Sequence, residues 1–299
     1  MNFPLPDKLK LRQNLPLDLK IKYTEERIRQ WYNFFGGQVY VSFSGGKDST
    51  VLLDICRKLY PNIEAVFCNT GLEFPEIVSF VKSIENVTHI RPKMPFTQVI
   101  KQYGYPIISK EQARYIRDVR NSTDAMKKLR LTGERKDGTK GKMGILSKKW
   151  RYLTNAPFEI SEQCCDVMKK RPFKQYEKCG KKPFIGTMVG ESSLRLQKYN
   201  REGCNAFNNK RPQSTPISFW RESDIWEYIK KYSLPYSKIY DMGYKRTGCT
   251  FCLFGYHMEN IGVDDRLTLL KKTHPKMYKY IMERLGFNQV LKWYPRGIE

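Results

Sequence analysis

The sequence predicts an α/β fold, a parallel sheet with helices on both faces. Three observations lead to this prediction. Short runs of β-branched and aromatic residues alternate with helical patterns along residues 37–90. The first of these runs is followed at once by adjacent glycines and then by a helix. The composition, 40% hydrophobic and 28% charged over 299 residues, is that of a folded protein with a sizeable core.

The expected elements can be placed in order. A first helix is predicted over Thr24–Phe35, with Thr24 as its N-cap and two glycines at its end. The predicted strands are Gln38–Phe43, Ile63–Cys68, Val87–Ile90 and Phe184–Val189. The predicted helices after the first are Asp48–Leu59, Glu76–Ile84, Ser223–Tyr232 and Pro275–Leu285.

These elements suggest one main domain with additions. Residues 1–36 form an N-terminal helical extension, residues 37–256 the main domain, and residues 257–299 a helical C-terminal tail. A basic insertion is expected at about residues 119–151, because Thr132–Gly144 is rich in Gly and Lys and lacks periodicity. We predict that it is an insertion or a mobile loop.

The chain is strongly basic, with 54 Lys and Arg against 30 Asp and Glu, a formal charge of +24. Such an excess favours a DNA or RNA partner, with the runs Lys127–Arg151 and Lys169–Lys182 as its contacts. The alternative is a solvated basic surface and a small phosphate-bearing substrate. No apolar stretch is long enough to span a bilayer, and the first 20 residues lack the apolar run of a secretory signal, so we expect a cytoplasmic protein without a membrane partner.

A phosphate-binding loop is predicted directly after the first strand, within the sequence Ser42-Phe43-Ser44-Gly45-Gly46-Lys47-Asp48-Ser49-Thr50. Two glycines let the backbone approach a phosphate, and the free N–H groups of the first helical turn then point at it. Lys47 adds a positive charge, and the serines add hydroxyl donors. Lys47 and Asp48 are the candidate catalytic residues of this loop. An ordinary helix-entry turn is the alternative.

Four of the eight cysteines form two pairs, Cys164-Cys165 and Cys249-x-x-Cys252. Four thiolates suit either zinc or a [4Fe-4S] cluster, and adjacent cysteines favour the wider cluster. Binding no metal is the third alternative. Lys169, Lys170 and Arg171 are candidates for positive charge beside such a cluster. Cys179 and Cys204 lie in basic segments, where a neighbouring cation would lower a thiol pKa, so either is a candidate catalytic sulfur carrier or an inert thiol.

The loop Ser44–Ser49 resembles the SGGxDS signature of the PP-loop superfamily, and the remaining motifs resemble its PAPS reductase family. Asn69-Thr70-Gly71-Leu72-Glu73-Phe74-Pro75-Glu76 is similar to the DTGxExPE stretch, with Asn69 in place of Asp. Gly186–Arg195, Pro216–Trp226 and Leu234–Cys252 resemble later blocks in the correct order. The resemblance implies a Rossmann-like fold of the adenine nucleotide alpha-hydrolase type. It places Asn69, Thr70, Gly71 and Glu73 near the nucleotide and Arg195 in the substrate pocket, and the cysteine pattern is similar to that of adenylyl-sulfate reductases.

Three functions follow as hypotheses. The first is a [4Fe-4S]-dependent sulfurtransferase that uses ATP, with Mg²⁺, to activate a nucleic acid, as the enzymes of DNA phosphorothioation and tRNA thiolation do. Its sulfur donor would be a cysteine desulfurase. The second is an adenylyl-sulfate or PAPS reductase with a thioredoxin-type reductant, which is weakened because no cysteine follows Cys252. The third is a non-catalytic nucleotide- or nucleic-acid-binding accessory protein.

Overall fold

The computed structural model describes residues 7–294 and contains one six-stranded sheet of order β3-β2-β1-β5-β7-β6. All its pairings are parallel except that of β6 with β7. The four predicted strands correspond to β1, β2, β3 and β5 and are close to prediction, although β5 is shorter than expected because it ends before Gly186. The bounds are β1 Val39–Phe43, β2 Ala65–Cys68, β3 Val87–Ile90, β5 Lys182–Ile185, β6 Asn205–Ala206 and β7 Gln213–Ser214.

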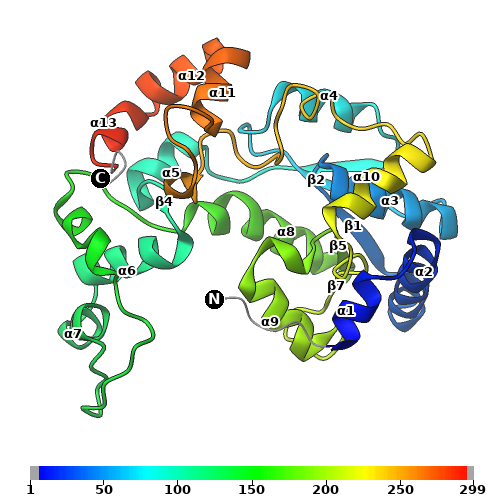
Figure 1. Cartoon of the computed structure of the whole chain (residues 1–299), viewed down its shortest axis with the longest axis horizontal. Coiled ribbons are helices and arrows are strands. Elements are labelled where there is room, and N and C mark those ends of the chain that lie inside the picture. Colours follow the sequence, from blue (N-terminus) through cyan, green and yellow to red (C-terminus); the bar gives the residue numbers. More distant parts are fainter. Residues whose placement is uncertain (1–6, 295–299) are drawn as a thin grey trace.

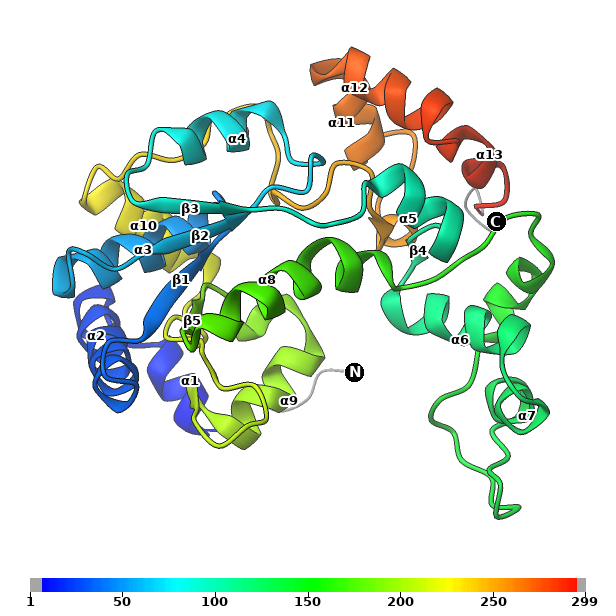
Figure 2. The ribbon, with the colours of Figure 1, turned by 180° about the vertical axis from the view of Figure 1, so that it is seen from behind.

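Helices cover both faces of this sheet, as predicted (Figures 1 and 2). Because side chains alternate along a strand, neighbouring residues of β1 point to opposite faces. Tyr40 stacks on Phe173 of α8, whereas Phe43 meets Phe80 of α4. The helices of the sheet region are α1 Asp7–Gln13, α2 Leu17–Phe34, α3 Lys47–Leu59, α4 Pro75–Lys82, α8 Arg171–Tyr176, α9 Ser193–Glu202 and α10 Glu222–Lys231.

The strand order reverses direction at β1. From β1 the chain runs outward through β2 and β3, and it later returns to place β5 on the other side of β1. In open parallel sheets such a reversal separates the loops at the carboxyl edge and creates the usual ligand-binding crevice. The predicted phosphate loop follows β1 and therefore lies at this point.

A second, smaller region packs beside the sheet (Figure 1). Its two-stranded parallel sheet pairs β4 Ile107–Ile108 with β8 Leu253–Phe254. The helical C-terminal tail was predicted, and His274 joins it to α4 through a side-chain contact of 3.1 Å between its Nε2 and a Glu76 carboxylate oxygen. The helices of this region are α5 Phe96–Tyr103, α6 Lys110–Asn121, α7 Asp124–Thr132, α11 Arg266–Thr273, α12 Pro275–Lys279 and α13 Phe287–Lys292. None of the helices within residues 7–294 is long and apolar enough to cross a membrane.

One local prediction was wrong. Thr24 is not an N-cap: α2 begins at Leu17, and the buried Thr24 hydroxyl accepts a hydrogen bond of 2.9 Å from Trp220 Nε1. A long-range contact of the fold here outweighs the local pattern. The predicted basic insertion begins within α6 and continues through α7, and residues 133–147 after α7 contain no helix. A 3-10 helix, Lys148–Asn155, ends it.

Candidate nucleotide and cysteine site

The phosphate loop requires glycine at both of its central positions. Gly45 has φ +72°, and a Cβ there would lie 2.7 Å from Val81 Cγ2. A Cβ on Gly46 would lie 2.6 Å from Thr247 Oγ1. The hydroxyls of Ser44 and Ser49 are 3.0 Å apart and hold the loop closed. The loop therefore brings bare backbone to the start of α3, where amide groups favour an anion.

Lys47 and Asp48 form the charged part of the loop. The Lys47 ammonium lies 3.1 Å from Glu222 and 3.5 Å from Asp48, and its backbone N–H donates to the Tyr240 hydroxyl at 2.8 Å. Burial raises the pKa of Asp48, against the attraction of Lys47. Asp48 Oδ1 is buried without a hydrogen-bond partner among the described residues. Ser42 and Thr50 complete the segment, and the Thr50 hydroxyl donates to Gly46 O at 3.0 Å.

The loop after β2 folds on its own side chains. Glu73 accepts hydrogen bonds from the Thr70 hydroxyl at 2.7 Å and the Thr70 amide at 3.0 Å. Asn69 Oδ1 accepts from the Gly71 amide at 3.0 Å, so the residue that replaces the family's Asp stabilises its own turn. This loop and the phosphate loop both lie at the carboxyl edge, after neighbouring strands.

A cavity of about 240 Å³ lies beyond β5 at the same edge. Arg195 and Lys198 of α9 line it, together with Thr187 and Ser218. Gly186 connects it to the phosphate loop, because a Cβ at Gly186 would lie only 3.0 Å from Ser49 Cα. Arg195, which the resemblance places in the substrate pocket, lines this cavity and pairs with Glu191.

The four predicted cysteine ligands are close enough to influence one another's pKa values. A hydrogen bond with the Cys164 thiol lowers the pKa of Cys165. Burial opposes this shift, and the positive charges of Lys110 and Lys169 add to it. Burial and the Cys249 charge raise the pKa of Cys252 to about 11. Lys169, which lies beside Cys249 and Glu73, has a pKa above its ordinary value, chiefly because of Cys249. Four thiols are a ligand set that suits an iron–sulfur cluster, and the two lysine ammonium groups would offset the negative charge of that cluster.

The thiols are not already arranged as ligands of a single ion. Within residues 7–294 no three Cys, His, Asp or Glu side chains form a group that could hold one metal ion. A backbone link nevertheless connects this region with the nucleotide loops, since the Thr250 amide donates to Leu72 O at 3.2 Å. Cys249 and Cys252 therefore lie directly behind the loop that carries Thr70 and Glu73.

Comparison with known proteins identifies the family. The model of the phosphoadenosine phosphosulfate reductase domain matches residues 38–148 and 135–253. The chain belongs to this family. An adenosine 5'-phosphosulfate reductase of Lysinibacillus sphaericus is 25% identical over 80% of this chain and 83% of its own length. Two uncharacterised proteins of Methanocaldococcus jannaschii are 25% and 28% identical over 88% and 78% of this chain. This PAPS reductase family member spans 52% and 38% of those two proteins.

Solved structures of a PAPS reductase and of a tRNA thiolase are also similar. The phosphoadenylyl-sulfate (PAPS) reductase of Candida auris, solved with phosphate, has 14% identity, a TM-score of 0.46, and coverage of 83% of this chain and 98% of its own. The U34-tRNA thiolase NcsA of Methanococcus maripaludis, solved with its [4Fe-4S] cluster, has 14% identity and a TM-score of 0.39. That similarity covers 91% of this chain and 80% of the thiolase.

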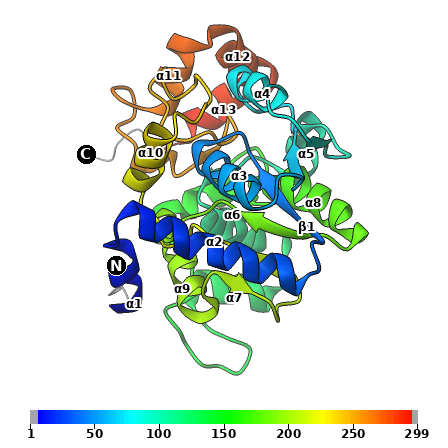
Figure 3. The same cartoon turned by 90° about the vertical axis from the view of Figure 1, so that its right-hand side faces the viewer.

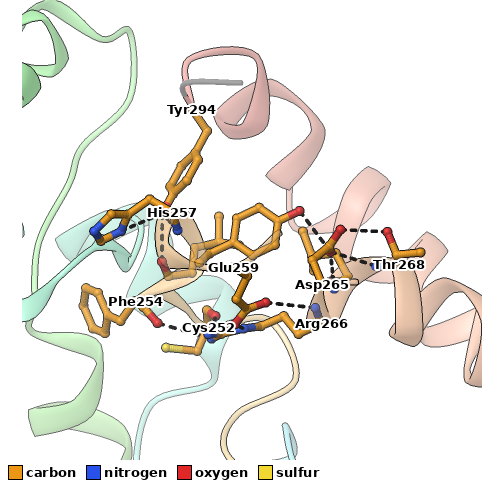
Figure 4. A network of polar contacts seen from close by, with 11 residues as sticks. Cys252, Phe254, His257, Glu259, Asp265, Arg266, Thr268 and Tyr294 are labelled. Carbon is orange, nitrogen blue, oxygen red and sulfur yellow. Dashed lines mark hydrogen bonds and ion pairs between the residues drawn. The ribbon is translucent and has the colours of Figure 1, made fainter. Parts of the chain in front are cut away.

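In this PAPS reductase family chain a clamp from the tail holds the segment of Cys252 (Figure 4). The Arg266 guanidinium donates to the carbonyls of Cys252 at 2.8 Å and Phe254 at 3.2 Å, and it pairs with Glu259. Asp265 caps α11 beside it by accepting from the amides of residues 267 and 268. Arg266 carries no sequence motif, and only the fold shows that it fixes a candidate ligand.

The remaining thiols are placed less favourably for sulfur transfer. Cys179 precedes β5, at the amino edge of the sheet and so opposite the phosphate loop. Cys204 lies at the carboxyl edge but is buried behind the cavity, and burial raises its pKa rather than lowering it as expected. Cys68 is buried, and it ends β2 close to Cys249. Burial raises the pKa of Cys68 to about 12.

Proposed function

We propose that this family member is a sulfurtransferase that activates a nucleic acid with ATP. The observation that carries the proposal is the joining of two sites, in which Thr250 ties the Cys249–Cys252 segment to the loop of Thr70 and Glu73. Nucleotide chemistry and sulfur chemistry can then occur at one place. The formal charge of +24 supports a polyanionic acceptor.

In the first step of this mechanism an acceptor oxygen attacks the α-phosphorus of ATP, and pyrophosphate leaves. The amides at the start of α3 and the Lys47 ammonium stabilise the negative charge that develops on the phosphates. Asp48, whose Oδ1 is buried and faces the Lys47 ammonium at 3.5 Å without a hydrogen bond, is the carboxylate of the loop that would hold Mg²⁺ there. Sulfur then displaces AMP from the activated acceptor.

Cys164, Cys165, Cys249 and Cys252 would hold the [4Fe-4S] cluster, with Lys110 and Lys169 as nearby positive charges. When bound, such a cluster would supply electron-transfer chemistry beside the nucleotide loops, since four cysteine ligands leave none of its irons open. The sulfur would come from a donor such as the persulfide of a cysteine desulfurase, and a thioredoxin-type reductant would supply the two electrons that bring it to the sulfide level before it displaces AMP. Arg266 keeps the Cys252 segment in place during this exchange.

The experiment is pyrophosphate release from ATP by protein purified without oxygen, in the presence and absence of duplex DNA or tRNA. We expect release that depends on nucleic acid and that Lys47→Ala abolishes. Lys58→Ala is the matched control, because Lys58 lies on the same helix with its side chain 46% exposed. Nucleic-acid-independent release, or none, would contradict the proposal.

A second function is favoured by the similarity to an adenosine 5'-phosphosulfate reductase over most of both chains. In that case adenylyl sulfate or PAPS would occupy the phosphate loop and the Arg195 cavity, and thioredoxin would deliver electrons. The same protein preparation decides between the two functions. Sulfite release from adenylyl sulfate with thioredoxin, without any nucleic acid, would establish the reductase.

A further inference from the structure

A hairpin projects from the small region after α7 (Figures 1 and 2). We call residues 133–149 the basic arm. Its two sides are joined by hydrogen bonds from the Gly141 amide to Gly133 O at 3.0 Å and from the Arg135 amide to Thr139 O at 2.8 Å. The turn is closed by the Gly138 amide on Arg135 O at 3.0 Å. The basic arm is therefore a defined hairpin rather than a chain without hydrogen bonds.

Arg130 anchors the basic arm to α6. Its buried guanidinium pairs with Asp118 at 2.9 Å, donates to Gly144 O at 2.9 Å, and lies 4.1 Å from the centre of the Tyr115 ring. The Leu146 amide returns a hydrogen bond of 2.7 Å to Arg130 O. These contacts fix the root of the arm, so that its tip is presented in a set direction.

The basic arm presents a cluster of exposed cations. Its two acidic side chains are engaged locally, since Glu134 pairs with Lys128 and Asp137 accepts from Thr139 at 2.7 Å. Within residues 7–294 no ion pair joins the exposed cations of the arm to an acid. These cations are Arg135, Lys136, Lys140, Lys142, Lys148 and Lys149.

The arm also has no aromatic ring on which a base could stack. Residues 133–149 contain no Phe, Tyr or Trp, whereas proteins that bind single strands use such rings as platforms for the bases. Clustered cations without rings suit a regular phosphate backbone instead.

The arm is connected to the cysteine site by α6, whose first residue, Lys110, lies beside Cys165. The 12 residues of α6 span about 18 Å.

We propose that the basic arm binds the phosphate backbone of a double-helical nucleic acid and holds it beside the cysteine site. This inference rests on the proposed function, because it assigns a binding surface to the nucleic-acid acceptor. It adds that recognition occurs through the backbone and not the bases. It also adds that the contact surface is separate from the nucleotide loop.

The experiment measures binding of a labelled DNA duplex by fluorescence anisotropy at several salt concentrations. The arm variant is the full chain with Arg135→Ala, Lys136→Ala, Lys140→Ala and Lys142→Ala. The control variant removes four exposed lysines from α11 and α12, Lys271→Ala, Lys272→Ala, Lys276→Ala and Lys279→Ala. Figure 3 shows these helices and the basic arm at opposite ends of the molecule. Both variants have the same net charge.

Each phosphate contact contributes about 0.9 to the slope of log affinity against log salt. We therefore expect the slope of the arm variant to fall by about 3 to 4, while the control variant keeps a slope close to that of the unmodified protein. Retained ATP affinity in the arm variant would show that it is folded. An equal loss of duplex affinity in both variants, or stronger binding of a single strand than of the duplex, would contradict the proposed role of the arm.

The outcomes separate the two proposals. If the unmodified protein binds duplex and the arm variant binds it equally well, the proposal that the arm binds nucleic acid is refuted while the sulfurtransferase proposal stands. If the unmodified protein binds no nucleic acid but binds ATP, both the proposed role of the arm and the proposed nucleic-acid acceptor are refuted. If binding falls only in the arm variant, the arm is supported whether or not pyrophosphate release is observed.

Discussion

Replacement of Arg266 by alanine tests whether the tail holds the cysteine segment. The guanidinium is the partner of two carbonyl oxygens, those of Cys252 at 2.8 Å and Phe254 at 3.2 Å, and it also pairs with Glu259. Alanine removes all of these interactions at once. We expect the segment from Cys252 to Phe254 to open more often, because its carbonyls lose their donor.

The magnitude follows from the number and exposure of the contacts. A hydrogen bond from a charged group contributes roughly 1.5 to 3 kcal/mol. The Arg266 side chain is 34% exposed, so water can replace part of each interaction, and the pair with Glu259 adds little. A loss of about 2 kcal/mol remains for the two carbonyls together. Since about 1.4 kcal/mol corresponds to a factor of ten, local opening should increase roughly thirtyfold.

The assay is the rate at which a thiol reagent labels Cys252 in metal-free protein, followed residue by residue by mass spectrometry. We expect faster labelling of Cys252 in Arg266→Ala and an intermediate rate in Arg266→Lys, which keeps the charge but not the planar fork. Arg284→Ala is the control, because Arg284 is an exposed arginine of the same tail. Equal labelling of Cys252 in all four proteins would refute the clamp.

Three further predictions concern the loop, the cap and the arm. Gly186→Ala should weaken ATP binding and destabilise the fold by about 1 to 3 kcal/mol, because the added Cβ would press on the first turn of α3. Calorimetry should show no such effect for the control Gly190→Ala, where an added Cβ would have nothing within 4 Å. Although burial opposes it, amide donors hold the pKa of Asp265 below its ordinary value, so the stability that this cap contributes should be lost as the pH falls through that lowered pKa. Thermal unfolding should show Asp265→Ala to be about 1 kcal/mol less stable near neutral pH and to lose less on acidification. Arg130→Ala leaves the buried Asp118 carboxylate with Arg117 at 3.3 Å as its remaining partner and removes the anchor of the arm, which should cost about 1 to 3 kcal/mol, and limited trypsin digestion should then cut the basic arm first.

The parts of the fold that follow from local chemistry were predictable. The strand before Ser44, the glycines and the helix after them are determined by residues next to one another, and the structure has them within a residue or two of prediction. The strand order is less local, but a parallel sheet follows from strands that alternate with helices. Thr24 shows the limit. Its sequence context fits a cap, yet seven residues of helix precede it because α2 packs against the core through Trp220 and other distant residues.

The candidate site was predictable only where its residues form motifs. Two cysteine pairs separated by 83 residues predict a metal site, because four thiols are a recognisable ligand set. Lys110 and Arg266 have no such signal: each is one of 54 basic residues, and the fold alone brings them to Cys165 and Cys252. The same reasoning explains Cys204, whose basic sequence neighbours suggested a lowered pKa. Burial acts in the opposite direction, and burial depends on the tertiary structure.

Distribution of charge, rather than its total, finally separates the functions available to this chain. A small sulfonucleotide would need positive charge only near the phosphate loop and the Arg195 cavity. Yet the exposed cations of the basic arm lie beyond α6, about 18 Å of helix away from the cysteine site. Positive charge at that distance does nothing for a bound mononucleotide beyond long-range attraction, which salt screens within about 10 Å. An extended polyanion can contact both places at once, and this arrangement is the one that the proposed nucleic-acid acceptor requires.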